Sequence, residues 1–339
     1  MKRSLGIGPV VFFCWALVSF GCAPSPTAKP LPQAPILPQT ANALSKNAWI
    51  AVISKGSTVN YWQLIHEGAR RAGNGLGVRV VWLEPTSTLT QAKIIDDCVA
   101  KHVSGIVIAP VSNKDLLGPV KKASSAGIPV VLIDTSLKGA PVASTIATDN
   151  FRAGSLAGQR TVELLNGKGS VVLMRFSKEA ENTTEREDGF LDTVRDSSVK
   201  ILSDNYYGGS TLTTAKQTAR RLITELNLNH RAGVAVVTVS ASSTEAMLIE
   251  LEASHIAGRV KFVGFDTSDK VIKGLRDHEI DALVVQSPQQ IGYLGVKMMV
   301  TTLQKGFIDP EVKTDCMLVD RENIDSPSVK AFLASPAGP

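Results

Sequence analysis

The sequence is short of aromatic residues, of clustered charge and of histidine, and each shortage excludes a class of protein. Aromatic residues make up 5% of the 339 positions, so a tryptophan or tyrosine near a cleft is informative. The net charge of +5 forms no basic stripe along the chain, which argues against a nucleic-acid partner. The five histidines are scattered and lack the spacing of a metal site. They are His66, His102, His230, His255 and His278.

The N-terminal segment has the order of an export signal. A basic pair precedes an apolar run at 10–18, which is too short to span a bilayer comfortably, and small residues then lead to Cys22. This order resembles a bacterial lipoprotein signal, which implies a signal peptide over 1–21 and lipidation of Cys22. Phe20 is bulkier than that pattern favours, so an ordinary signal peptide cleaved nearby is the alternative. We expect a periplasmic or cell-envelope protein that a lipid anchor holds to a membrane.

A proline-rich segment follows at 22–47, and we expect it to be an extended tether rather than part of a core. No later stretch is long and apolar enough to span a bilayer. Two cysteines remain beyond the tether. Cys98 lies on the apolar side of a helical pattern, which favours a small core residue, and a disulfide between Cys98 and Cys316 stays open.

From residue 48 onward, short apolar runs alternate with helical patterns, which predicts parallel sheets flanked by helices. About eleven strands are too many for one ordinary open sheet, so we predict an α/β protein with two doubly wound lobes. A capping box at 88–91 predicts one helix start, and 182–185 and 242–245 predict two more. The expected strands are 49–53, 78–83, 105–109, 128–133, 142–147, 171–174, 199–202, 234–238, 261–264, 283–285 and 316–319.

Polar side chains end several of these strands. Asp134 and Asp266 each follow a buried apolar run, and Thr148, Asp149 and Asn150 close another. Ligands of open α/β sheets bind where strands end, so these groups predict one shared polar site.

Seven segments in order resemble the ribose-type periplasmic sugar-binding proteins, the solute receptors of ABC importers. The resemblance covers about 48–325 and implies a periplasmic binding protein type I fold, with a sugar held between two lobes joined by three crossovers. It places the N-terminal lobe at 48–147 plus 287–312 and the C-terminal lobe at 148–286 plus 313–333. Closure on the sugar would present a surface to a membrane permease. The segments are 55–62, 108–111, 126–134, 147–150, 185–190, 263–266 and 285–288.

The resemblance also assigns ligand contacts. Trp62 is the preferred residue for stacking on a sugar face, with Tyr61 second. Tyr207 matches an aromatic on the opposite face, and Tyr206 is the alternative for that role. Carboxylates, amides and arginine bond sugar hydroxyls, the expected role of the polar residues. Local helix caps, core packing or surface pairing are the alternatives for individual residues. The full set is Lys55, Tyr61, Trp62, Asp134, Asp149, Arg186, Tyr207, Ser240, Asp266 and Gln286.

Three positions depart from the family pattern. Ala109 stands where many members carry asparagine, Thr135 replaces an arginine, and Ser240 replaces a ligand-binding amide. The contact set for ribose is therefore incomplete, which predicts a different sugar, a sugar derivative or another small polar ligand.

Other functions fit the sequence less well. Glycoside hydrolysis needs two carboxylates at a set separation, but these aspartates follow a binding-protein pattern, and neither a nucleophile elbow nor a phosphate loop occurs. A regulator of the lactose-repressor type would need an N-terminal DNA-binding helix pair instead of a signal segment. A sensory receptor that passes occupancy to a membrane kinase or chemoreceptor stays open. We expect a monomer that is not an enzyme and needs neither cofactor nor metal.

Overall fold

The computed structural model of the protein describes residues 48–56, 60–85 and 88–334. The predicted signal peptide, the predicted lipidation site Cys22 and the predicted tether lie outside these residues. Within the described ranges, none of the helices combines the length and the apolar character that a membrane span requires.

The first lobe is built on a six-stranded sheet in the order β11-β5-β4-β3-β1-β2, with every neighbouring pair parallel. Near-continuous apolar runs make its central strands fully buried, as a sheet covered on both faces requires. The strands are β1 Trp49–Ile53, β2 Arg79–Leu83, β3 Gly105–Ile108, β4 Val130–Ile133, β5 Ser144–Thr148 and β11 Glu311–Thr314. The helices are α1 Asn60–Leu76, α2 Thr88–Ala100, α3 Asn113–Ser125 and α9 Pro288–Leu303.

The second lobe repeats this plan with a sheet in the order β12-β10-β9-β8-β6-β7. Four of its pairings are parallel, and the β10–β12 pairing is antiparallel. Its strands are β6 Ser170–Arg175, β7 Lys200–Tyr207, β8 Val234–Thr238, β9 Lys261–Phe265, β10 Ala282–Gln286 and β12 Cys316–Val319. Its helices are α4 Asn150–Leu164, α5 Glu181–Arg195, α6 Leu212–Glu225, η1 Leu228–His230, α7 Ala241–Ala253, α8 Asp269–Arg276 and α10 Pro327–Ala334.

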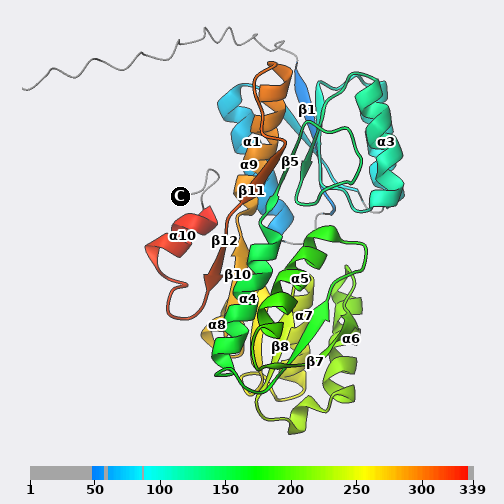
Figure 1. Ribbon diagram of the computed structural model, residues 1–339. Helices are drawn as coiled ribbons and strands as arrows, with labels where there is room; N and C mark the ends of the chain where they lie inside the picture. The colour runs from blue at the N-terminus through cyan, green and yellow to red at the C-terminus, as the bar shows by residue number, and fades with distance from the viewer. Residues whose placement is uncertain (1–47, 57–59, 86–87, 335–339) are drawn as a thin grey trace, which may run out of the picture. The chain divides into compact units, whose positions relative to one another are not determined.

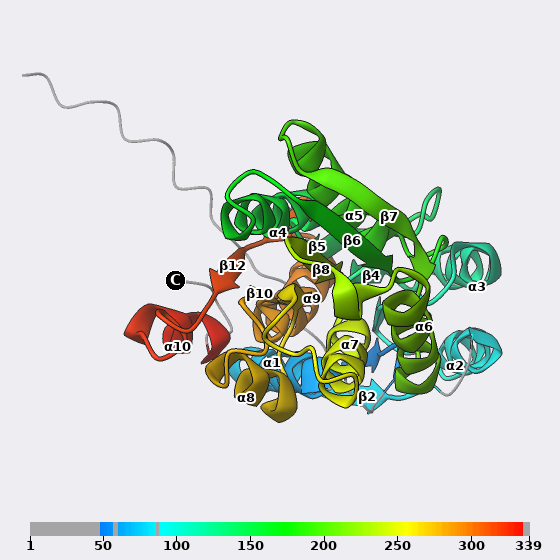
Figure 2. The ribbon, with the colours of Figure 1, turned by 90° about the horizontal axis from the view of Figure 1, so that it is seen from below.

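Each sheet has a separate apolar core on each face. In the first lobe, α1 and α9 cover one face and α2 and α3 cover the other. In the second lobe, α4 and α5 lie on one side of the sheet, with α6 and α7 on the opposite side (Figure 2). This confirms the predicted α/β architecture with two doubly wound lobes, and Figure 1 labels many of their elements.

The chain passes between the two sheets three times within the described residues. The passages follow β5 at Asp149, β10 at Ser287 and β11 at Asp315. The third lies two residues beyond the predicted change at 312/313, because β11 continues to Thr314 alongside β5. β11 is missing from the sequence prediction, and the antiparallel direction of β12 was not expected either.

Gln91, the last residue of the capping box predicted at 88–91, has a role that the sequence did not predict. Helix α2 does begin at Thr88, but the Gln91 side chain is buried and serves the neighbouring strand ends. Its amide nitrogen donates to the main-chain oxygens of Ser54 (3.1 Å) and Ala109 (2.7 Å), and its oxygen accepts from Val111 N (3.1 Å). Because buried carbonyls at strand ends must find donors, the Gln91 side chain serves them, and its contact at the helix start stays a prediction.

Two helix pairs approach closely through glycine, one pair in each lobe. A Cβ at Gly68 of α1 would collide with the main-chain oxygen of Gln289 in α9, and one at Gly154 of α4 would collide with that of Arg186 in α5. Gly154 therefore fixes the position of the turn that carries Arg186.

Candidate functional site

Two aspartates occupy equivalent places in the two lobes. Asp134 follows β4 and Asp266 follows β9, and each of these strands is third in the order of its sheet. Both residues have left-handed backbones, with φ of 67° and 64°, a conformation that Asp adopts more readily than most residues. The main-chain N–H of Asp134 donates to Ile146 O (2.8 Å), and that of Asp266 donates to Val284 O (3.0 Å). The same backbone device thus turns both carboxylates out of their sheets.

Asp134 is held by donors from several elements. Lys55 Nζ donates to its Oδ2 at 2.6 Å and also to Thr135 Oγ1, Tyr61 Oη donates to its Oδ1 at 2.8 Å, and Asn182 Nδ2 donates to Oδ2 at 3.3 Å. Burial alone would raise the pKa of Asp134, but the Lys55 ammonium and these hydrogen bonds outweigh burial and hold the pKa below its ordinary value. Asp134 is therefore a stable carboxylate at neutral pH.

Arg186 and Gln286 form the centre of the polar network. The guanidinium of Arg186 is buried and donates to Asn150 Oδ1 (2.9 Å), Val239 O (2.9 Å) and Gln286 Oε1 (2.7 Å). It also lies over the ring of Phe265, 5.0 Å from the centroid. This cation is built into the second lobe rather than paired with its neighbours on the surface of α5.

Gln286 joins elements of both lobes. Besides Arg186, its Oε1 accepts from Thr148 Oγ1 (2.7 Å) and from Tyr61 Oη (3.4 Å), and its Nε2 donates to Asp266 Oδ1 (2.7 Å). Because β10 ends here and the chain then crosses to the first lobe, Gln286 couples the crossover to both strand-end sites.

Asp266 has a different electrostatic environment from Asp134. Burial raises its pKa above the ordinary value, and the Arg186 charge, the Gln286 amide and the main-chain N–H of Ala241 offset this only in part. The Asp134 charge raises the pKa of Asp266 further. No lysine or arginine forms an ion pair with Asp266 in the described part of the chain.

A cavity of about 230 Å³ borders this network. Polar groups of Tyr61, Asp266 and Gln286 face it, with apolar side chains forming the remaining walls. The lining residues are Tyr61, Leu64, Asp266, Thr267, Val285, Gln286, Pro288 and Leu333. A partly apolar cavity with a few convergent polar groups is the usual form of a small-molecule site.

The two predicted stacking residues behave differently. Trp62 is 8% exposed and belongs to the apolar core beneath α1 and α9, where it meets the Tyr61 ring edge-on with centroids 5.3 Å apart. Tyr61 directs its hydroxyl into the polar network instead. Its pKa is raised by burial and by the charges of Asp134 and Asp266, so the hydroxyl stays a proton donor. Ligand contact by either ring remains a prediction.

Asp149 and Ser240 are helix N-caps. The Asp149 side chain accepts from Arg152 N (3.2 Å) at the start of α4, and Ser240 Oγ accepts from Ser243 N (3.4 Å) at the start of α7. Asp149 also donates its main-chain N–H to Thr314 O (3.0 Å), which ties two of the three passages together. These local roles account for both residues without a ligand.

Tyr207 lies at the end of β7, where Arg175 and Lys178 approach its ring at 5.5 and 5.3 Å from the centroid. Its main-chain oxygen accepts from Thr218 Oγ1 (3.0 Å). The structure does not connect it by hydrogen bonds to the Asp134–Gln286 network, so its predicted contact with a sugar stays a prediction.

Contacts between the lobes also include residues that the sequence interpretation missed. Ser136 Oγ donates to Glu181, and Lys138 Nζ forms a 2.7 Å ion pair with Glu181 Oε1. With the Asn182–Asp134 bond, they join the loop after β4 to the first turn of α5. The sequence signal for these contacts is the pair Glu181 and Asn182 at the start of the helix that carries Arg186. Such a pair predicts a helix cap equally well.

The described residues offer little for metal or thiol chemistry. Within their ranges, no group of three or more His, Cys, Asp or Glu side chains could hold a metal ion. Cys98 and Cys316 are both free and buried, in the cores of different lobes. The disulfide that the sequence left open is therefore not formed.

The geometry agrees with the comparison to known families. A family model described as "Periplasmic binding protein domain" matches residues 50–306. The chain belongs to the periplasmic binding protein family. Its relatives place it among the ribose-type sugar-binding members.

Three similar proteins illustrate this periplasmic binding protein relationship. The ribose import binding protein of Salmonella typhimurium is 26% identical over 288 residues, covering 84% of this chain and 94% of that protein. The D-apiose import binding protein of Actinobacillus succinogenes is 26% identical over 285 residues, with coverages of 82% and 89%. An ABC transporter solute-binding protein from Agrobacterium vitis, solved with bound D-fucose, is 27% identical with a TM-score of 0.78, covering 84% of this chain and 99% of that one.

The three departures from the family pattern have local explanations in this periplasmic binding protein. Ala109 is fully buried and its oxygen accepts from Gln91. Thr135 Oγ1 accepts from Lys55 and donates to Asp134 (3.0 Å), so Lys55 supplies a cation beside the position that has lost an arginine. Ser240 caps α7. The polar groups near Asp134 thus differ in shape from those that the family pattern predicts, and their positive charge comes from Lys55 instead of an arginine.

Proposed function

We propose that this protein is the solute-binding lipoprotein of an ABC importer, which captures a monosaccharide or related polyol between its lobes and delivers it to a membrane permease. The observation that carries the proposal is the polar network joining Asp134, Asp266, Arg186 and Gln286 at the edge of a cavity. Hydroxyl groups both donate and accept, so a ring bearing several of them can bond carboxylates, an amide and a guanidinium at once.

The charge of the network supports an uncharged ligand. Lys55 and Arg186 supply two positive charges, and Asp134 and Asp266 supply two negative ones, all within a connected set of hydrogen bonds. A charged ligand would leave an uncompensated charge in a buried site, which is costly. Charge-assisted hydrogen bonds to neutral hydroxyls contribute about 1.5–3 kcal/mol each, enough for selectivity with three or four partners.

A thermal-shift screen with aldoses, ketoses, polyols and amino sugars, followed by calorimetry, tests the ligand class. We expect at least one sugar or polyol to raise the melting temperature and to bind with measurable heat, without being turned over. Stabilisation by an amino acid or nucleoside and by none of the sugars would overturn the proposal. The altered surface at Thr135 and Lys55 leads us to expect that ribose is not the best ligand.

The lipid anchor is a separate part of the proposal and rests on the sequence around Cys22 alone. We expect the full chain to partition with membranes when expressed in a bacterium and the Cys22→Ser variant to lose that association. Equal membrane association of both would show that lipidation at Cys22 does not hold the protein. Co-purification of a permease with the ligand-loaded protein would support transport rather than signalling.

A further inference from the structure

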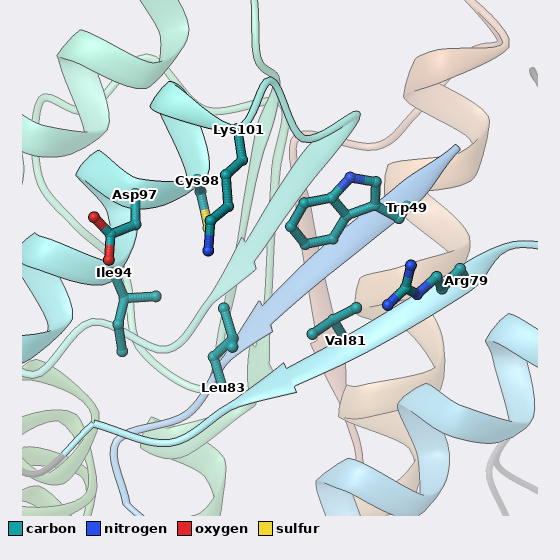
Figure 3. A pocket seen from close by; sticks show the side chains of 8 residues that line it. All are labelled: Trp49, Arg79, Val81, Leu83, Ile94, Asp97, Cys98 and Lys101. Atoms are coloured by element: carbon teal, nitrogen blue, oxygen red, sulfur yellow. The ribbon is translucent and has the colours of Figure 1, made fainter. Parts of the chain in front are cut away.

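A second cavity lies away from the polar network, on the outer side of the first lobe. It has a volume of about 470 Å³ and runs between helix α2 and the edge strand β2 (Figure 3). We call it the α2–β2 groove. Its lining residues are Trp49, Arg79, Val81, Leu83, Ile94, Asp97, Cys98 and Lys101. None of them belongs to the site described above.

The groove follows directly from the periodicity of its two walls. Arg79, Val81 and Leu83 alternate along β2 and therefore share one face of the strand. Residues 94, 97 and 98 share one face of α2, and Lys101 follows in the turn just after the helix ends, where its main-chain N–H donates to Asp97 O. Trp49 of β1 stands between the two walls in Figure 3. Trp49, Leu83 and Ile94 pack against the core cluster that contains Cys98, and these residues also line the cavity.

Most of the surface inside the groove is apolar. Val81, Leu83, Ile94 and the indole of Trp49 are half-buried, and Cys98 is almost fully buried. Burial raises the pKa of the Cys98 thiol to about 11, so this side chain is a neutral wall and not a nucleophile. The interior therefore suits an apolar body such as a planar ring or a branched chain.

The rim carries a net positive charge without internal partners. Arg79 and Lys101 are exposed, and neither side chain has a hydrogen-bond or ion-pair partner among the described residues. Asp97 precedes Lys101 by one helical turn, but the two side chains are not within ion-pairing distance of each other. Two cations and one carboxylate leave one positive charge, which matches a single negative charge on a ligand.

The corresponding place in the second lobe lies between β7 and α6. Strand β7 is the edge strand there, and α6 takes the place of α2. Leu202 and Tyr206 of β7 pack against the apolar cluster that contains Leu222 and Ile223 of α6. In the first lobe, Leu83 of β2 likewise packs against the core cluster that contains Ile95 and Cys98 of α2, so apolar packing at this place is common to both lobes.

We propose that the α2–β2 groove binds a small amphipathic monoanion, an apolar ring or branched chain that carries one carboxylate. The apolar body would lie against Trp49 and Val81, and the carboxylate would face Arg79 and Lys101. This site is independent of the proposed sugar site, since the two share no residue.

A charge series of one aromatic body tests the proposal. The probes are 2-naphthoate, its neutral amide and 2-naphthylmethylammonium, titrated into the purified protein by calorimetry and ligand-observed NMR. We expect 2-naphthoate to bind with a Kd of about 1 mM, the amide more weakly, and the cation not measurably. The variants Arg79→Gln and Lys101→Gln should each weaken the binding of 2-naphthoate about three- to fivefold, as the loss of an exposed charge does, and leave the binding of the amide unchanged.

The matched control is Lys121→Gln, which removes an exposed lysine from α3 and should change nothing. Melting temperatures of all variants should stay at that of the parent, because the changed side chains are exposed. Competition between 2-naphthoate and a sugar that binds the protein would place the probe in the other site and overturn the proposal. Equal binding of the three probes, or equal losses in Lys121→Gln, would overturn it as well.

Discussion

Asp134 and Asp266 have the same backbone geometry and opposite electrostatics. Each ends the third strand of its sheet in a left-handed conformation and donates its N–H to the adjacent strand. The pKa of Asp134 lies below its ordinary value, because Lys55 and the Tyr61 hydroxyl outweigh the effect of burial. The pKa of Asp266 lies above it, because burial dominates. The fold thus determines where a carboxylate stands, and its neighbours determine how firmly it holds its charge.

The difference suggests a division of labour between the lobes. Asp134 is held by side chains of both lobes, including Asn182 of α5, and stabilises the arrangement in which they meet. Asp266 is stabilised mainly by Arg186 and Gln286. A buried carboxylate with incomplete compensation gains most from new hydrogen-bond donors. We infer that Asp266 contributes more to ligand affinity, while Asp134 contributes more to stability.

Removing Arg186 should have the largest effect, because it withdraws the counter-charge on which Asp266 depends. We expect Arg186→Met to lower the free energy of unfolding by about 3–5 kcal/mol and to abolish sugar binding. Chemical denaturation and calorimetry measure the two quantities. Arg195→Met in the same helix is the matched control, since that arginine is exposed and pairs only loosely with Asp192 at 3.8 Å. A stable Arg186→Met protein that still binds sugar would refute the central role of this cation.

A double variant tests which of the two aspartates Arg186 stabilises. If Arg186 acts mainly by compensating Asp266, adding Asp266→Asn to Arg186→Met should recover part of the lost stability, whereas adding Asp134→Asn should not. A double-mutant cycle gives both coupling energies. Equal coupling of Arg186 to the two aspartates would contradict the division of labour.

Neutralising Asp134 should destabilise the protein at neutral pH. Asp134→Asn leaves the Lys55 ammonium, whose side chain is 21% exposed, without its partner, and we expect a loss of about 1–3 kcal/mol. The folded pKa of Asp134 lies below that of the unfolded chain, so its stabilisation is present at neutral pH and disappears as pH falls through the folded pKa. The deficit of the variant in free energy of unfolding, relative to the parent, should therefore shrink in acid. A deficit that is constant from pH 7 to pH 3 would show that charge is not its origin.

Much of this architecture could be predicted from the sequence, because buried parallel strands appear as continuous apolar runs. Strand β11 was missed for the opposite reason. Its residues, Glu311 to Thr314, include the exposed Glu311 and Lys313 and form an edge strand that, among the described strands, pairs with β5 alone. Nothing in such a polar tetrapeptide distinguishes a strand from a loop until its neighbour is known.

The residues of the candidate site were predicted from their places at strand ends, but their partners were not. The contact of Lys55 with Asp134 joins residues 79 positions apart, and that of Arg186 with Gln286 joins residues 100 apart. The sequence also cannot show that Gln91 would serve the buried carbonyls of Ser54 and Ala109. Pairings of this kind depend on tertiary packing, which local patterns do not encode.

Neutralising Asp266 should change the free energy of unfolding in the opposite direction to neutralising Asp134, and by a smaller amount. Its folded pKa lies above that of the unfolded chain, so between the two values the folded state binds more protons and the stability due to this group falls as pH rises. Asp266→Asn removes this penalty, and we expect it to be more stable than the parent by about 0.5–2 kcal/mol at pH 7. Below about pH 4, the ordinary pKa of Asp, the advantage should vanish, since the parent carboxyl is then protonated in both states.

Chemical denaturation of Asp266→Asn and Asp134→Asn from pH 7 to pH 3 measures whether the two variants change the free energy of unfolding in opposite directions. Because the asparagine cannot take a full charge-assisted bond from a sugar hydroxyl, Asp266→Asn should also bind sugar at least about tenfold more weakly, a loss of roughly 1.4 kcal/mol or more. A more stable protein with weaker binding is the signature of a carboxylate kept buried for its ligand. If both asparagine variants are destabilised at pH 7 with the same pH profile, the two strand-end aspartates are equivalent in charge as well as in backbone, and neighbours such as Lys55 do not set them apart.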